Sequence, residues 1–156
     1  MKTILFVGAV IVLGSVLLAA ICSVRATAAT ETPSATAARL ASAVYDWENL
    51  QPVPVSNGVR RAVLDGPTMT LDKLHCHITT LNPGQVSGPP RLHLQEEVII
   101  VKEGTIEATF DGYTQTAGPG SVIFFASHAT TRLRNPTKQP ATYTVVYYYT
   151  PLTPKE

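Results

Sequence analysis

Turn-forming residues recur at short intervals between residues 65 and 136 and leave no room for a long regular element. The segments between these turns are short and rich in Val, Ile, Thr, Phe and Tyr: residues 69–81, 97–102, 105–110, 113–117, 121–125 and 141–149. None has the length and 3.6-residue period of a helix. Asp111-Gly112 separates two of the segments and is typical of a two-residue hairpin turn. We predict an all-β fold, a single sandwich or barrel of short antiparallel strands spanning residues 44–152.

The N-terminus has the pattern of an exported protein. Residues 4–24 contain no charged side chain, and Ala26-Thr27-Ala28 supplies the A-x-A pattern that a signal peptidase reads. We therefore predict that residues 1–28 are a signal peptide and that the protein is periplasmic or extracellular. Because residues 4–24 are also long enough to span a bilayer as a helix, the alternative is a retained N-terminal membrane anchor. The rest of the chain faces the exported side in both cases.

Residues 29–43 are predicted to be a linker. They are rich in Ala, Thr and Ser and contain one Pro, a composition that buries too little apolar surface to fold. Trp47 lies just after them, at the start of the predicted domain, and is expected to pack against the domain surface.

Charge and cysteine content limit which partners the protein is expected to bind and what can stabilise its fold. The chain has 12 basic and 11 acidic residues, a formal net charge of +1, and no basic stripe, which excludes nucleic acid as an expected partner. Cys22 falls in the predicted signal, so Cys76 has no partner for an internal disulfide. We predict that Cys76 is a small buried apolar residue and that stability comes from a packed core.

Two spaced motifs resemble those of the cupin superfamily. The first reads Gly-x5-His-x-His-x3–4-Glu-x6-Gly in the family and aligns here with Gly84, Arg91, His93, Glu97 and Gly104, and the spacing from His93 to Glu97 to Gly104 fits in full. The second, Gly-x5-Pro-x-Gly-x2-His-x3-Asn, is matched by Gly120, Ala126, Ser127, His128, Thr131 and Asn135. The resemblance covers residues 69–149 and implies a single jelly-roll barrel whose interior holds the site.

The resemblance also implies a metal site, for which half of the ligands are present. In the family, the two His and the Glu of the first motif and the His of the second hold one divalent metal ion. Those positions are Arg91, His93, Glu97 and Thr131 in this chain. A guanidinium offers no lone pair to a metal, and threonine offers only a neutral hydroxyl. Because protein metal sites need about three strong ligands, we predict that a divalent transition metal is bound weakly or not at all.

Other histidines could complete the ligand set. On the strand at residues 69–81, alternate apolar residues occupy one face, and His75 and His77 occupy the other. The apolar face suits the interior better, so we predict that both histidines face solvent, although a one-residue register change would turn them inward. His128 takes the family's Gly position in a tight turn, where we expect its side chain at the rim of the cavity. His77 and His128 are the two candidate substitute ligands.

Arg91 suggests an alternative to a metal. If it points inward with His93 and Glu97, it can pair with Glu97 and neutralise the carboxylate as a metal would. An Arg/His/Glu pocket of this kind suits a small molecule that carries a carboxylate or hydroxyl groups. The competing interpretation places Arg91 at the rim, where most arginines are exposed, with no ligand bound.

We predict an exported cupin that binds a small polar molecule in its barrel, with Arg91, His93, Glu97 and Thr131 lining the pocket. The alternative is a metal-dependent enzyme of the dioxygenase, isomerase or decarboxylase type. A third hypothesis is a purely structural β-module, since no Ser/His/Asp triad, phosphate loop or dinucleotide fingerprint is present. The resemblance further implies pairing into homodimers, and membrane contact is expected only through residues 4–24.

Overall fold

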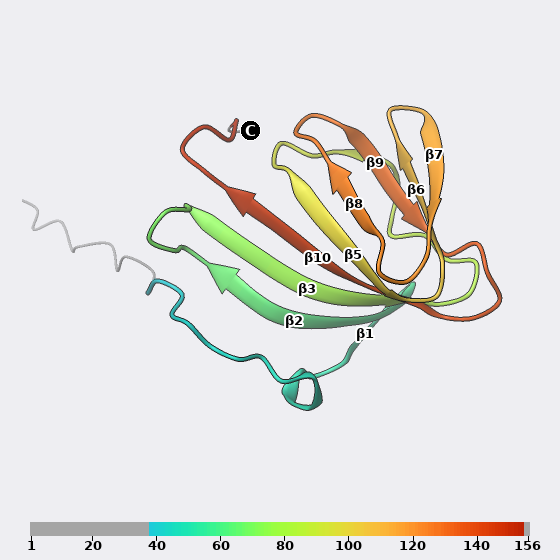
Figure 1. The fold of residues 1–156 in the computed structure, drawn as a ribbon, viewed down its shortest axis with the longest axis horizontal. Helices are drawn as coiled ribbons and strands as arrows, with labels where there is room; N and C mark the ends of the chain where they lie inside the picture. Colours follow the sequence, from blue (N-terminus) through green and yellow to red (C-terminus); the bar gives the residue numbers. More distant parts are fainter. Residues whose placement is uncertain (1–37, 155–156) are drawn as a thin grey trace, which may run out of the picture. The chain divides into compact units, whose positions relative to one another are not determined.

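The structure, a computed structural model, describes residues 38–154, which form two antiparallel β-sheets (Figure 1). The larger sheet has the strand order β1-β2-β3-β10-β5-β8, and the smaller sheet has the order β4-β9-β6-β7. A short 3-10 helix, η1 (Trp47–Asn49), precedes the strands. The strands are β1 (Val53–Val55), β2 (Gly58–Gly66), β3 (Lys73–Leu81), β4 (Arg91–Leu92), β5 (Glu97–Glu103), β6 (Ile106–Phe110), β7 (Tyr113–Ala117), β8 (Val122–Phe125), β9 (Thr130–Arg134) and β10 (Ala141–Tyr149).

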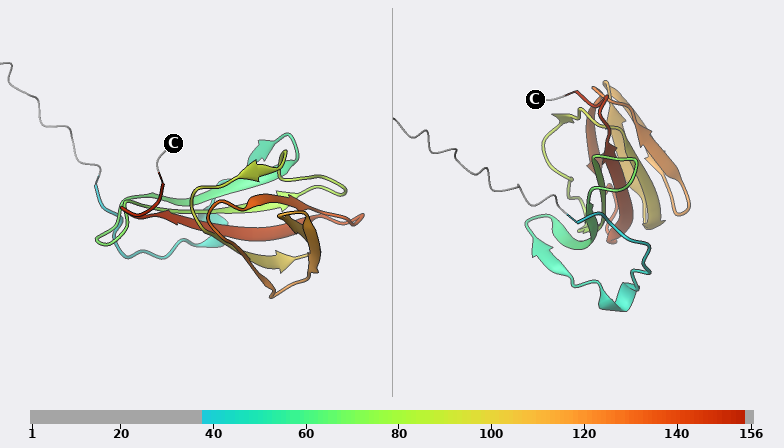
Figure 2. Two further views of the ribbon diagram at one scale, coloured as in Figure 1. Left: turned by 90° about the horizontal axis from the view of Figure 1, so that it is seen from above. Right: turned by 90° about the vertical axis from the view of Figure 1, so that its left-hand side faces the viewer.

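The two sheets share one hydrophobic core. Leu81, Ile99 and Phe125 of the larger sheet cluster with Ile106 and Leu133 of the smaller sheet. The smaller sheet lies at one end of the larger one, and β2, β3 and β10 extend beyond it (Figures 1 and 2). The all-β prediction is therefore confirmed, and the architecture is a β-sandwich of the jelly-roll kind.

The predicted strands are present, and the hairpin turn is where the sequence places it. β7 and β10 have the predicted bounds, and β6 and β7 pair across Asp111 and Gly112. Both turn residues have positive φ, 47° and 86°, as a two-residue hairpin turn requires. β2 and β9 were not predicted, because charged residues on each strand, such as Arg60-Arg61 on β2, obscure the apolar alternation.

The predicted signal at residues 1–28 lies outside the described residues, as does most of the linker at 29–43. Of the linker, residues 38–43 are described, and the Leu40 N–H donates to the Pro67 carbonyl oxygen at 2.8 Å. No helix within residues 38–154 is long and apolar enough to cross a membrane.

Trp47 packs over the outer face of the larger sheet. Its ring lies 4.5 Å from Arg61 Cζ and 3.5 Å from Lys102 Nζ, which are cation–π distances. Arg61 is the register partner of Ile78, so Ile78 lies on this outer face as well. The expected surface packing of Trp47 is confirmed, and its contacts lie on the same face of the sheet as the apolar residues of β3.

Asn135 joins the ends of several strands. Its side chain is fully buried, and its Nδ2 donates to the carbonyl oxygens of Leu81, Asn82 and Gln139 at 3.2, 3.3 and 2.7 Å. Its Oδ1 accepts from the Thr137 backbone N–H and from the Thr137 hydroxyl. This motif residue therefore has a structural role, because it satisfies turn carbonyls that would otherwise be buried without a donor.

Candidate functional site

A cavity of about 1030 Å³ lies against the inner face of the larger sheet. Strand β10 pairs with β3 on one side and with β5 on the other, so residues of the three strands form rows across this face. His75, Tyr147 and Glu97 make one row, and His77, Val145 and Ile99 make the next. All four site residues predicted from the sequence, Arg91, His93, Glu97 and Thr131, line the cavity.

The structure corrects the predicted orientation of the β3 histidines, which face inward. His77 lines the cavity, and His75 is only 8% exposed and stacks on Tyr147 with ring centroids 4.4 Å apart. The sequence argument assumed that the apolar side of β3 must face the interior. The apolar side instead faces outward, on the side that Trp47 packs against, which leaves the polar side for the cavity. Cys76 belongs to the outward set and is half-buried rather than fully buried, and burial raises the pKa of its thiol.

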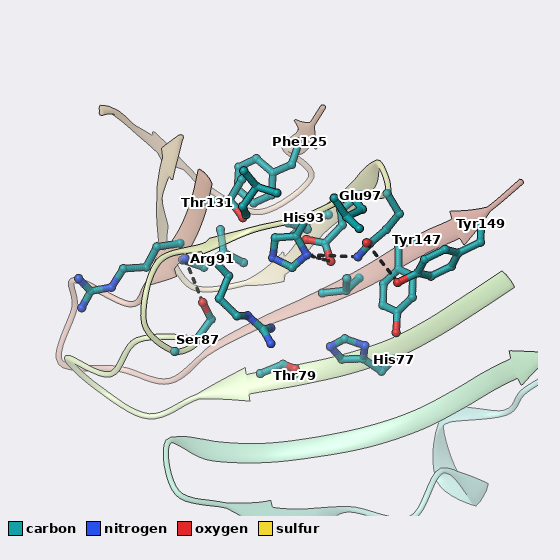
Figure 3. Close-up of a pocket in the computed structure, with 18 of the residues that line it drawn as sticks. His77, Thr79, Ser87, Arg91, His93, Glu97, Phe125, Thr131, Tyr147 and Tyr149 are labelled. Atoms are coloured by element: carbon teal, nitrogen blue, oxygen red, sulfur yellow. Dashed lines mark hydrogen bonds and ion pairs between the residues drawn. The ribbon is translucent and has the colours of Figure 1, made fainter. Parts of the chain in front are cut away.

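His93 and Glu97 form the centre of the site. His93 Nδ1 lies 3.4 Å from Glu97 Oε1 and 3.2 Å from Gln95 Nε2 (Figure 3). Tyr149 completes the network, since its hydroxyl donates to Gln95 Oε1 at 3.2 Å. β4 ends at Leu92, and the segment between β4 and β5 carries His93 and Gln95 to the cavity beside Glu97, the first residue of β5.

Burial disfavours the charged forms of both central groups. Burial raises the pKa of Glu97, while Arg91 and a hydrogen bond from Gln95 act in the opposite direction. Burial, and secondarily the charge of Arg91, lower the pKa of His93. His93 is therefore a neutral imidazole at neutral pH, with one nitrogen that accepts and one that donates.

Arg91 lines the cavity but does not pair with Glu97, which corrects the expected ion pair. The ion pairs within residues 38–154 do not include Arg91, and Glu97 Oε1 instead lies 3.4 Å from Nδ1 of the neutral His93. Figure 3 shows the Arg91 side chain extending across the cavity toward His77 and Thr79 on β3. Because β4 is only two residues long, Arg91 and Glu97 do not belong to one regular strand, as their alternation in the sequence had suggested.

The two candidates from the second motif differ in their placement. Thr131 is buried and is the register partner of Arg91 across β4 and β9. His128 is exposed, has a φ of 65° and is not among the residues that line the cavity. Its ring instead lies beside Ser127, with Nδ1 2.9 Å from Oγ. The structure therefore brings His77, and not His128, to the cavity that contains His93 and Glu97.

The donor set does not fit the family's metal ion. Of the four ligand positions, only His93 and Glu97 offer strong donors, and Arg91 adds a positive charge beside them. Residues 38–154 contain no group of three or more His, Cys, Asp or Glu side chains placed to hold a metal. His77 Nδ1 is already engaged, 3.1 Å from a terminal nitrogen of Arg60.

The fold and the site define a jelly-roll protein with a polar cavity against its larger sheet. A family model described as the cupin domain matches residues 77–147. This match, together with the fold and the two motifs, supports membership of the cupin superfamily.

Solved structures with the same fold come from several bacteria. A predicted oxalate decarboxylase from Thermotoga maritima superposes with a TM-score of 0.61 at 16% identity, over 69% of this chain and 99% of that one. KdgF from a Halomonas species gives 0.60 at 14%, over 74% and 97%. An RmlC-like cupin from Shewanella frigidimarina gives 0.59 at 17%, over 72% and 95%. These likenesses show the fold alone, and no curated protein matches the sequence.

Several cavity residues were missed in the sequence. Arg60, Gln95, Tyr147 and Tyr149 all line the cavity, and none occupies a specified position of a cupin motif. Tyr147 and Tyr149 are two residues apart on β10 and therefore share a face, a signal that was available in the sequence. Arg60 gave no such signal, because β2 itself was not predicted.

The inward position of His77 predicts a pH dependence of stability. Burial, then the charges of Arg60 and His75, lower its pKa from 6.5 to about 3, so the unfolded chain binds a proton that the folded protein excludes. We expect the free energy of unfolding to fall as the pH decreases from 6.5 toward 3. In the His77→Gln variant, this dependence on pH should be weaker by up to the slope that the binding of one proton produces. Urea unfolding between pH 4 and pH 8 measures it. At pH 8, where His77 is neutral in both the folded and the unfolded state, the difference in stability between the native protein and His77→Gln reports packing effects alone. An equal dependence of stability on pH in the two proteins would contradict the inward placement.

Proposed function

We propose that this cupin binds a small polar molecule in its cavity without a complete metal site. The observation that carries the proposal is that a polar cavity of about 1030 Å³ contains the His93–Glu97 pair, while Arg91 and Thr131 occupy the other two ligand positions of the family. Such a volume is typical of small-molecule sites, in which a few polar groups fix the orientation of the ligand. We further propose that the protein acts after export, on the basis of the signal pattern in residues 1–28.

A thermal-shift screen of the purified full-length protein tests this function. Small polar compounds are added before and after dialysis against EDTA, and the metal content is measured by elemental analysis. We expect at least one compound to raise the Tm equally in both preparations, because a ligand that binds the folded state stabilises it by mass action. The shift should be lost in His93→Ala, and the metal content should be substoichiometric and unaffected by that substitution.

The second candidate is a metal-dependent enzyme whose ligand set is completed by His77. One observation favours it: His77 lines the same cavity as His93 and Glu97. The structural neighbours include a sugar phosphate isomerase from Silicibacter pomeroyi and a polyketide cyclase from Streptomyces resistomycificus. About one equivalent of a single transition metal that is lost in His93→Ala would overturn the metal-free proposal and favour this candidate.

A further inference from the structure

The wall of the cavity formed by β2 and β3 carries a cluster of cationic and hydrogen-bonding groups outside the cupin motifs. A terminal nitrogen of Arg60 lies 3.1 Å from His75 Nε2 and 3.1 Å from His77 Nδ1. Those two ring nitrogens are 2.9 Å apart. The Asp65 carboxylate lies 3.2 Å from the other nitrogen of His75, and Lys73 pairs with the same carboxylate at 3.0 Å.

This geometry selects the tautomer of His77. A guanidinium is only a hydrogen-bond donor, so Arg60 contacts His77 favourably when His77 Nδ1 is an unprotonated acceptor. The proton of His77 then sits on Nε2. The lowered pKa of His77 agrees with a neutral ring. His77 is therefore oriented by Arg60 and keeps an N–H free to donate.

A second guanidinium approaches the same ring from the other sheet. Arg91, on β4, extends toward His77 and Thr79 (Figure 3). Among the residues that the structure describes, neither Arg60 nor Arg91 has a carboxylate within ion-pair distance. Both side chains are exposed and line the cavity, which places two positive charges there without an ion-pair partner among the described residues. An anion placed there would be attracted by both arginines.

We propose that the ligand carries a carboxylate that binds between Arg60 and Arg91 against His77. Two guanidinium groups and a neutral imidazole N–H match the acceptor oxygens of a carboxylate. Glu97 lies in a different part of the cavity, with His93, Gln95 and Tyr149 around it. A second carboxylate would be repelled there, whereas hydroxyl groups could donate to Glu97. The ligand class is therefore a hydroxylated monocarboxylate. This inference rests on the proposed binding function and adds the charge of the ligand.

Three related probes separate these features. D-gluconate carries one carboxylate, D-gluconamide replaces it with a neutral group of the same shape, and D-glucarate carries two carboxylates. Their affinities for the full-length protein are measured at pH 7 by titration calorimetry. We expect gluconate to bind at least about tenfold more tightly than gluconamide, because charge-assisted hydrogen bonds contribute roughly that much. Glucarate should bind more weakly than gluconate.

Matched variants locate the subsite. Arg60→Gln and Arg91→Gln should each weaken gluconate binding by about tenfold, whereas the affinity for gluconamide should stay nearly unchanged. Arg134→Gln is the control: Arg134 is exposed on β9, pairs with Glu107 and does not line the cavity. A loss in Arg134→Gln equal to that in the cavity variants would overturn the proposal, because it would indicate non-specific charge attraction.

The failure of this inference is distinguishable from the failure of the proposed function. If gluconate and gluconamide bind equally and both require His93, the cavity binds polar molecules but has no carboxylate subsite. If glucarate binds as tightly as gluconate, the monocarboxylate assignment is wrong. If gluconate does not bind even at tens of millimolar, the carboxylate inference is overturned, while a compound that stabilises the protein in the thermal-shift screen would still support the binding function.

Discussion

The double variant Arg91→His/Thr131→His is expected to bind one equivalent of a divalent transition metal ion tightly. Arg91 and Thr131 are register partners on β4 and β9, and both line the cavity with His93 and Glu97. The two substitutions remove a positive charge and add two imidazole donors, which raises the number of strong ligands from about two to about four. We expect the affinity for Zn²⁺ or Ni²⁺ to rise by at least about two orders of magnitude. Competition with a chromogenic chelator measures the change.

A control variant tests whether the added donors are responsible. Arg91→Gln/Thr131→Val removes the same guanidinium and the same hydroxyl but adds no imidazole, so its metal affinity should stay close to that of the native protein. Adding His93→Ala to the histidine double variant should remove most of the gain. If the native protein binds the metal as tightly as the histidine double variant does, the native site already holds a full ligand set. That result would contradict the proposed absence of a metal site.

Gly104→Ala is expected to destabilise the domain by about 3 kcal/mol or more. Gly104 has a φ of +75°, a conformation that L side chains rarely adopt. An added Cβ would lie 2.7 Å from the Pro140 carbonyl oxygen and 2.8 Å from Ala141 Cα and Cβ. Those neighbours are the first residue of β10 and the residue before it, and Ala141 is fully buried, so relief requires backbone movement in the core. Urea unfolding at pH 7 measures the loss.

Gly112→Ala provides the matched comparison. Gly112 has a similar φ of +86°, but an added Cβ would meet nothing within 4 Å. Only the backbone cost applies, about 1 kcal/mol. The difference between the two variants therefore reports the close contact between the turn after β5 and the start of β10. Equal losses in the two variants would show that this contact is not tight in solution.

The sequence predicted the fold from its turns and motif spacings, and those signals are local. The Asp111-Gly112 hairpin and the bounds of β7 and β10 follow from residues next to one another in the chain. The orientation of β3 could not be obtained in this way. It depends on what covers each face of the sheet, and Trp47, far away in the sequence, packs on the outer face against Arg61 and Lys102. When both faces of a strand are covered, its own sequence does not determine that the apolar side faces inward.

The candidate site divides along the same line. Arg91, His93, Glu97 and Thr131 all line one cavity, because motif spacing fixes their positions in the fold. The predicted pairing of Arg91 with Glu97 was wrong, because the strand ends at Leu92 and the Arg91 side chain extends toward β3 instead. The contribution of Arg60 and His77 depends on the register between β2 and β3, which includes an irregularity between Ala62 and Leu64 that the residues themselves do not signal.

The position of β10 has a consequence for the order of assembly. β3 and β5 do not pair with each other, and each pairs with β10, which follows all the other strands in the sequence. During synthesis the chain can form the β1–β3 meander and the β5–β8 pairing, but these remain separate pieces until β10 leaves the ribosome and inserts between them. His77 and Glu97 stand on opposite sides of that strand, so the cavity cannot exist before the larger sheet closes.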